Sequence, residues 1–229
     1  MCGRFGVEIE YVQLALWYQA AVGVEDPGPR FNIAPTQPVA VVLDRGGNRV
    51  LDELRWGLIP SWAKDRAMGN RFINARAETV ATLPAFREAF RQRRCIVPAS
   101  RYYEWQRAGA RKLPHSIARV DRAPMSFAGL SEVWRDFATG ELVRSCTIIT
   151  TNANAALARI HDRMPVILAG AAVESWLEPT SDPSALLGLL RPRPDDELRA
   201  EPISQLINNA RNEGPDVIQP PEKELTLDL

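Results

Sequence analysis

Apolar positions recur along the chain with two different spacings, which separate the expected helices from the expected strands. Helical spacing predicts helices at 8–20, 83–93, 152–160, 172–178 and 184–190. Short apolar runs predict strands at 39–44, 49–54, 94–97, 115–120, 125–130 and 145–151. The glycine pair in RGGN, between the first two of these strands, indicates a hairpin turn.

Turn-forming residues separate these segments. GVEDPGPR at 23–30 and RPRPDDE at 191–197 are typical of loops, and the chain after residue 213 is expected to be mostly irregular. Neither an internal repeat nor an interdomain linker is evident. Short strands joined by loops and a few helices predict one α+β domain over residues 1–229, with a largely antiparallel sheet and peripheral helices.

Composition narrows the class of protein. The 229 residues, 45% hydrophobic and 24% charged, suit one soluble domain with a sizeable core. No apolar run has the length of a membrane span, and a signal-peptide pattern is absent, so we expect no membrane partner. Three widely spaced cysteines argue against a disulfide framework and for a cytoplasmic location. Two histidines without paired cysteines predict no metal site, and we expect no cofactor.

Charge is distributed unevenly although the formal net charge is zero. Residues 1–170 carry 23 basic and 16 acidic side chains, whereas residues 171–229 carry 5 and 12. This asymmetry permits a basic functional face, although charges that simply solvate different surfaces explain the numbers as well. Within residues 86–112, eight basic side chains are interleaved with aromatic residues, a combination typical of single-strand binding surfaces.

Cys2 is the first candidate for chemistry. A start methionine before a small residue is normally trimmed, so we expect the mature chain to begin at Cys2. An α-amine with a pKa near 7.7–8.0 and a thiol near 8.5 would then share one residue. A free cysteine is usually a small buried hydrophobe, but a chain terminus is seldom buried. We therefore expect Cys2 to be accessible, and Cys95 and Cys146 to be core residues.

Two acid–base candidates lie later in the chain. Glu104 follows two tyrosines in RYYEW, and a carboxyl in an apolar pocket has the raised pKa that proton transfer near neutrality requires. An exposed strand residue between core aromatics is an equal alternative. His161, in ARIHDRMP, has an ordinary pKa near 6.5 and neighbours, Asp162 and Arg163, that either orient it or cap the turn.

Further candidates suit a nucleic acid. Asn74 and Arg76 in NARAET would point to the same side of an extended segment, where an amide orients a group and a guanidinium clamps a phosphate. A loop that satisfies its own backbone is the alternative. Trp62 follows a proline turn in WGLIPSWAKD and could stack on a base, whereas Trp56 is expected in the core.

Together these segments resemble the SOS response-associated peptidase (SRAP) family, the abasic-site-processing DNA–protein crosslink proteins. The matching segments run in order through nearly the whole chain: MCGRF, RFNIAPTQPV, RWGLIPSWAKD, INARAET, RCIVPASRYYEW, IITTNAN, IHDRMPVIL and PISQLINNARN. The resemblance implies a compact single domain with a barrel-like antiparallel sheet. It also implies a monomer that binds single-stranded DNA in a positively charged groove and associates with the nucleoid when bound.

The resemblance further implies roles at matching positions. The Cys2 amine and thiol would capture the aldehyde of an abasic sugar as a durable thiazolidine, which shields the lesion. Asn74 would orient the amine, Glu104 would shuttle protons, and His161 would assist sugar opening and crosslink reversal or strand scission. DNA contacts would come from Arg4, Arg76, Trp62 and Thr150. Strand cleavage by an abasic-site lyase reaction, and a peptidase activity linked to methionine removal, are also expected.

Two other classes of function remain open. A thiol peptidase or amidase could use Cys2 as nucleophile with Glu104 and His161 as its partners. A non-catalytic reader of DNA would need only the basic and aromatic surface.

Overall fold

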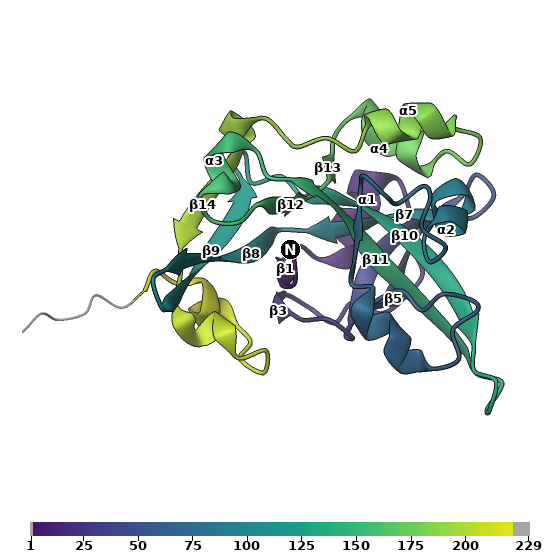
Figure 1. Ribbon diagram of the computed structural model, residues 1–229, viewed down its shortest axis with the longest axis horizontal. Coiled ribbons are helices and arrows are strands. Elements are labelled where there is room, and N and C mark those ends of the chain that lie inside the picture. The colour runs from purple at the N-terminus through teal and green to yellow at the C-terminus, as the bar shows by residue number, and fades with distance from the viewer. Residues whose placement is uncertain (1, 222–229) are drawn as a thin grey trace, which may run out of the picture.

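Five strands of the larger sheet close into a ring. In order around the ring, these are β5 (Arg49–Trp56), β4 (Pro38–Asp44), β7 (Arg94–Ala99), β10 (Met125–Arg135) and β11 (Leu142–Asn152). Figure 1 shows β5, β7, β10 and β11 of this ring in its right half. Neighbours pair antiparallel, except that β11 returns to pair in parallel with β5, with Cys146 opposite Trp56. The sheet thus closes into a mixed barrel, and the predicted α+β class with a largely antiparallel, barrel-like sheet is confirmed.

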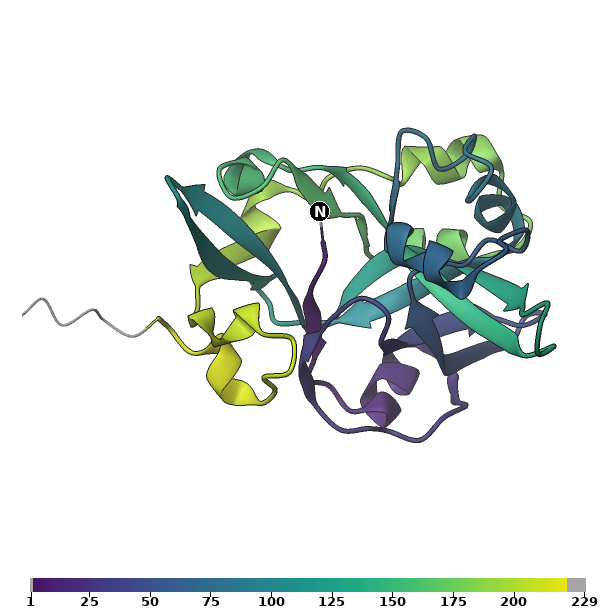
Figure 2. The same cartoon turned by 60° about the horizontal axis from the view of Figure 1, so that its bottom comes forward.

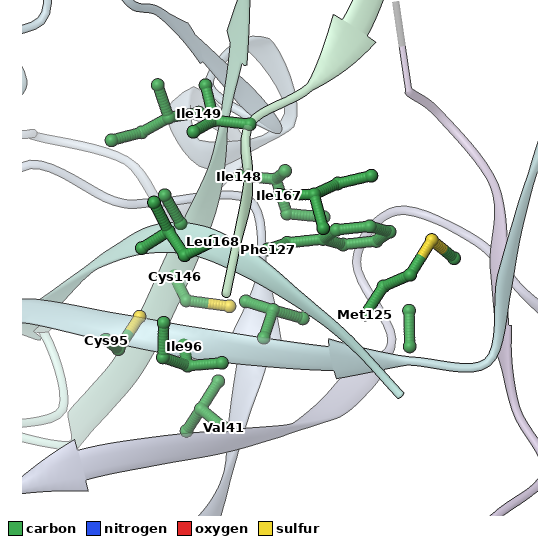
Figure 3. Close-up of a cluster of buried hydrophobic side chains, with 14 of the residues drawn as sticks. Val41, Cys95, Ile96, Met125, Phe127, Cys146, Ile148, Ile149, Ile167 and Leu168 are labelled. Carbon is green, nitrogen blue, oxygen red and sulfur yellow. The ribbon is translucent and has the colours of Figure 1, made fainter. Parts of the chain in front are cut away.

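Apolar residues of these strands form one contiguous core. Figure 3 draws part of it, including Val41, Ile96 and Phe127 from three neighbouring strands. All three side chains are fully buried, as are Cys95 and Cys146, which confirms the core prediction for both cysteines. Strands buried on both faces read as continuous apolar runs, which explains why 39–44 and 94–97 were recognisable in the sequence.

Gly129 permits close contact between strands inside this core. A Cβ at this position would lie 2.9 Å from the Cys95 sulfur and 3.0 Å from the Thr147 carbonyl oxygen. Any larger residue would push β10 away from both neighbouring strands, so glycine is required here by packing.

A second, five-stranded sheet lies beside the barrel. Its order is β14 (Leu198–Pro202), β9 (Arg111–Arg119), β8 (Arg101–Ala108), β1 (Phe5–Val7) and β3 (Arg30–Ile33). Figure 2 shows the first residues of the chain running between the β8–β9 hairpin and the barrel. Because β1 is paired on both sides, with β3 and with β8, the segment that contains Cys2 continues into an interior strand.

The helices are short and peripheral. The first three lie inside the predicted segments with narrower bounds, and the last two each begin one residue earlier than predicted. They are α1 (Tyr11–Tyr18), α2 (Arg87–Gln92), α3 (Ala155–Ala158), α4 (Ala171–Leu177) and α5 (Pro183–Gly188). Specific residues set the limits: Gln19 ends α1 in the left-handed region at φ 53°, and the Asn154 side chain accepts from the Leu157 N–H at the start of α3.

The remaining elements are short. They are the strands β2 (Ala21–Val22), β6 (Asn74–Arg76), β12 (Arg163–Pro165) and β13 (Ile167–Leu168), and the 3-10 turns Arg66–Arg71, Asp195–Glu197, Gln205–Asn208 and Pro215–Ile218. The computed structural model describes residues 2–221, so residues 222–229 of the tail predicted after residue 213 lie outside this range. Within it, no helix is long and apolar enough to cross a membrane.

Candidate active site

Cys2 lies three residues before β1 and is completely buried. Its carbonyl oxygen accepts a 2.8 Å hydrogen bond from the Asn74 side-chain amide. The expectation of an accessible Cys2 was therefore wrong for the chain that carries Met1, because β1 inserts between two strands instead of forming a loose end. Burial raises the pKa of the Cys2 thiol well above its ordinary value, and the nearby Glu104 carboxylate raises it further. The resting sulfur is therefore a protonated thiol.

Asn74 and Arg76 lie on strand β6, which pairs in parallel with β11. The intervening Ala75 is fully buried, Asn74 is half-buried beside Cys2, and Arg76 is exposed. The extended conformation agrees with the prediction that both polar side chains share one side of the strand. Within residues 2–221, the Arg76 side chain makes no hydrogen bond or ion pair, so its guanidinium remains available to an anion.

Glu104 lies on β8 and is only 4% exposed. Burial raises the pKa of its carboxyl to about 7, so both protonation states are populated near neutral pH. The neighbouring Tyr103 points to the other face of the strand, where it packs with Ile203, Ile207 and Val217 of the C-terminal segment. The interpretation of Glu104 as a buried acid–base group is thus favoured over that of an exposed strand residue.

His161 follows α3, and its Nε2 lies 4.0 Å from Glu104 Oε2. Its Nδ1 accepts the backbone N–H of Arg163 at 3.0 Å and also lies 2.8 Å from Asp162 Oδ1. The backbone N–H is a fixed donor, whereas the Asp162 side chain is 86% exposed and can move, so the backbone contact decides the tautomer. In the neutral ring the proton is then on Nε2, facing Glu104. Burial lowers the pKa of His161, which favours this neutral form.

An ion pair joins the His161 segment to the turn that follows strand β6. The Arg163 guanidinium contacts both carboxylate oxygens of Glu78, at 2.7 and 3.0 Å, and donates to the Thr150 carbonyl at 2.7 Å. Glu78 was not among the residues predicted from the sequence. Glu78 in NARAET and Arg163 in HDRMP carry opposite charges, but they are 85 residues apart. The sequence alone therefore gives no reason to pair them.

Arg4 lies at the edge of the site and is already engaged. Its Nη1 donates to Asn32 Oδ1 at 2.7 Å and to the Ile207 carbonyl at 2.8 Å, and its guanidinium carbon lies 5.9 Å from the centre of the Trp105 ring. Burial lowers the pKa of Arg4 from its very high ordinary value. The contact between Arg4 and DNA therefore stays a prediction. If Arg4 makes it, the guanidinium is already held in place by protein contacts.

An open cleft of about 450 Å³ adjoins these residues. Its lining residues combine acid–base, aromatic and basic groups: Glu104, Trp105, Arg107, Lys112, His161 and Asn208. One of the eight basic residues within 86–112 is not on the surface. Arg94 is buried and donates to four backbone carbonyls, including those of Trp176 and Glu178. Within residues 2–221, no group of three metal-ligating side chains could hold an ion.

Comparison with known proteins connects this geometry to a family. The family model described as "SOS response associated peptidase (SRAP)" matches residues 1–210. The chain belongs to the SRAP family. The resemblance inferred from the sequence motifs is thereby confirmed.

Relatives of this SRAP chain are similar over almost their full length. The abasic site processing protein YoqW of Bacillus subtilis (strain 168) is 40% identical, over 96% of this chain and 99% of its own. The abasic site processing protein YedK of Escherichia coli (strain K12) is 30% identical, over 96% and 100%. A crystal structure of a Bacteroides thetaiotaomicron protein superposes with a TM-score of 0.87 at 27% identity, over 96% and 99%.

Two predicted DNA contacts of the SRAP chain differ in exposure. Trp62 is 53% exposed in the loop after β5, whereas Trp56 is buried in the core, as expected for both. Thr150 is completely buried on β11, with its hydroxyl 3.4 Å from the Ala75 carbonyl oxygen. A direct side-chain contact between Thr150 and DNA is therefore ruled out in this conformation, because β6 and β12 flank that part of the strand.

Proposed function

We propose that this protein, once Met1 has been removed, captures abasic sites in single-stranded DNA through Cys2 as a thiazolidine crosslink. The observation that carries the proposal is the environment of Cys2. Its backbone is held by Asn74, and it lies beside a buried carboxyl whose pKa is raised to about 7. The names of the relatives supply the substrate class, the abasic site.

Removal of Met1 would convert the Cys2 nitrogen from an amide into an amine. Asn74 Oδ1 is buried and accepts no hydrogen bond from residues 2–221. The same side chain already donates to the Cys2 carbonyl oxygen, so its free acceptor lies close to the Cys2 backbone. We propose that Oδ1 accepts a hydrogen bond from the amine and directs its lone pair toward the aldehyde.

The chemistry needs proton transfer at two steps. The amine adds to the sugar aldehyde, and the resulting hydroxyl leaves as water to give an imine. The thiol then adds to the imine carbon, a carbon–sulfur bond forms, and the thiol proton ends on the nitrogen. Glu104 suits both steps because a carboxyl with a pKa near 7 can give a proton to the departing hydroxyl and recover one from the thiol.

His161 would act on the sugar side of the same reaction. Its Nε2–H faces Glu104 across 4.0 Å, on the side that opens into the cleft. We propose that it assists opening of the sugar ring and the proton transfers of crosslink reversal. Strand scission by a lyase reaction would use the same imine, and the peptidase label would correspond to release of Met1.

The exposed Arg76 and Trp62 would bind DNA around the lesion, through a phosphate and a base respectively. Arg4 would contribute a second phosphate contact. The protein would act as a monomer, with no membrane partner, on the nucleoid when bound to DNA and in the cytoplasm otherwise.

The test uses single-stranded DNA with one abasic site and the same strand with a tetrahydrofuran in place of the aldehyde. The processed protein should give an adduct that survives denaturation on the first strand and none on the second. A protein with an uncleaved extension before Cys2 should bind both strands but form no stable adduct. Turnover of a peptide substrate without adduct would indicate a thiol peptidase, and salt-sensitive reversible binding alone would indicate a DNA reader.

A further inference from the structure

Glu78 and Arg163 form an ion pair that the proposed mechanism does not use. Arg163 is the first residue of β12, and Glu78 lies in the turn after β6. Both strands pair with the same part of β11, where Thr150 is opposite Arg76 on one side and Pro165 on the other. The ion pair therefore joins the two strands that flank β11.

The Arg163 side chain is held by several groups, although its strand is short. β12 has three residues, so backbone pairing holds Arg163 only at the end of a short ladder. Its guanidinium contacts both carboxylate oxygens of Glu78 and donates to Asn152 Oδ1 at 2.8 Å and to the Thr150 carbonyl at 2.7 Å. The Arg163 side chain is 10% exposed and that of Glu78 is 48% exposed. A bidentate contact of this kind fixes the direction of a guanidinium as well as its distance.

This ion pair adds little to the stability of the fold. Half-exposed pairs gain little net free energy, because water screens them and two long side chains must be ordered. The Arg163 guanidinium holds the pKa of the Glu78 carboxyl below its ordinary value, so the carboxylate is charged at neutral pH. A charged pair that hardly stabilises the fold can still determine where the Arg163 backbone lies.

The Arg163 backbone N–H points at the His161 ring, where two groups compete for one nitrogen. His161 Nδ1 accepts this N–H at 3.0 Å, which requires the proton of the neutral ring on Nε2. Asp162 Oδ1 lies 2.8 Å from the same nitrogen, and an ionised carboxylate only accepts, so it favours the proton on Nδ1. The two tautomers differ at the site because Nε2 lies 4.0 Å from Glu104 Oε2. Only the first tautomer presents a proton on that side.

We infer that Glu78 is a positioning residue: it holds Arg163 so that the Arg163 backbone N–H stays on His161 Nδ1 and the ring proton stays on Nε2. The inference rests on the proposed function, in which His161 assists opening of the abasic sugar. In that step the carbon–oxygen bond of the ring breaks, and Glu104 takes the proton of the anomeric hydroxyl and returns one to the ring oxygen. The Nε2–H stays on His161 and donates a hydrogen bond to that oxygen. The other tautomer would turn a lone pair toward it.

The test compares Glu78→Gln with Glu174→Gln, which each remove one carboxylate from a similar ion pair. Glu174 of α4 contacts the Arg49 guanidinium through both oxygens and is 59% exposed. Nitrogen NMR of the processed protein at about pH 8 shows which ring nitrogen of each histidine carries the proton. His115 is an internal reference, because its Nδ1 lies 3.0 Å from the Leu113 carbonyl oxygen, which only accepts.

In the wild type and in Glu174→Gln, the His161 proton should be on Nε2. In Glu78→Gln the share on Nδ1 should rise, and adduct formation and transfer on saturating abasic single-stranded DNA should slow about threefold to tenfold, as the competent fraction falls. Reaction of Cys2 with glyoxylate, an aldehyde with no ring to open, should keep the wild-type rate. Weaker DNA binding cannot explain this pattern, because the substitution removes a negative charge and the DNA is saturating.

Melting temperatures separate positioning from loss of structure. Both glutamine variants should lie within about 4 °C of the wild type, the shift expected for a half-exposed ion pair in a domain of this size. Unchanged His161 nitrogen signals in Glu78→Gln overturn the inference, whatever the rates, and a changed tautomer with wild-type rates on abasic DNA also overturns it. If the wild type gives no adduct with abasic DNA but Glu78→Gln still changes the tautomer, the proposed function fails and the positioning of His161 by Glu78 stands.

Discussion

The barrel core and the segment before β1 both bury cysteine completely, yet they surround it with different groups. Cys95 and Cys146 lie among apolar side chains of β7, β10 and β11, where burial raises the pKa of the Cys146 thiol to about 12. Cys2 is equally buried, but Asn74 holds its backbone and Glu104 lies nearby. Exposure therefore does not distinguish the cysteine that we propose to be reactive from the structural ones. The polar groups around it do.

Replacing each cysteine in turn should give the largest difference in formation of the stable adduct. Cys2→Ala should abolish the stable adduct with abasic DNA while leaving DNA binding largely intact, because phosphate contacts supply most non-specific affinity. Cys2→Ser keeps the amine and should give a weaker, reversible imine adduct. Denaturing gels measure the adduct, and equal crosslinking by Cys2→Ala would exclude the thiazolidine mechanism.

Cys146→Ala is the matched control from the barrel. It should crosslink like the wild type but lose about 1–2 kcal/mol of unfolding free energy, because it leaves a small cavity in a packed core. Urea denaturation measures this loss.

Substitution of the two acid–base groups should separate the steps of the reaction. Glu104→Ala should slow crosslinking about 10²–10⁴-fold, the usual contribution of general acid–base catalysis, yet permit eventual adduct because an aminothiol reacts with aldehydes unaided. His161→Ala should slow formation less and impair release more. Two time courses check this, one for adduct formation and one for transfer to a competing abasic strand. Wild-type kinetics in both variants would remove the two residues from the site.

Glu104 should also make stability depend on pH. Its folded pKa of about 7 lies above its ordinary value of 4.5, so the fold favours the protonated carboxyl. The associated stability is fully present below about pH 4.5 and is lost as pH rises through 7. Glu104→Gln should therefore match the wild type at pH 4.5 and exceed it by up to about 3 kcal/mol at pH 8. Urea denaturation at both pH values measures the difference, and parallel pH profiles would show that Glu104 titrates normally.

The smallest expected effect concerns the exposed arginine beside the site. Arg76→Ala should weaken binding to single-stranded DNA and reduce the slope of log affinity against log salt by about one unit at most, as for one lost phosphate contact. Arg144→Ala offers a control, since this arginine is paired with Asp52 on the barrel. An unchanged slope in Arg76→Ala would remove this residue from the DNA surface.

Local pattern was sufficient to predict the strands of the barrel and the burial of Cys95 and Cys146, because fully buried strands form continuous apolar runs. Closure of the barrel was expected only from the family resemblance. It depends on the parallel pairing of Arg55–Trp56 with Ser145–Cys146, two segments about 90 residues apart, and no local period encodes such a contact.

In the site, too, local sequence identified candidate residues, whereas their burial and contacts depend on segments distant in sequence. The aromatic neighbours of Glu104 left a buried carboxyl with a raised pKa and an exposed strand residue as equal alternatives, and only the packed structure shows that the carboxyl is buried. The burial of Cys2 depends on β1 entering between β3 and β8. Thr150 and Arg4 show most clearly what the sequence alone could not predict, namely contacts with segments far away along the chain. The hydroxyl of Thr150 is enclosed by strands that pair with β11, and Arg4 is held by the Ile207 carbonyl, 203 positions away.

The central claim, that Cys2 reacts through both its amine and its thiol, is tested most directly by locating the adduct. The crosslink formed with abasic single-stranded DNA is digested with nuclease and trypsin, alkylated, and examined by mass spectrometry. The prediction is a Cys2–Arg4 peptide that has lost Met1, carries the sugar remnant and resists alkylation at sulfur. An adduct on Lys64, Lys112, Cys95 or Cys146, or a Cys2 whose thiol still alkylates, would contradict the claim.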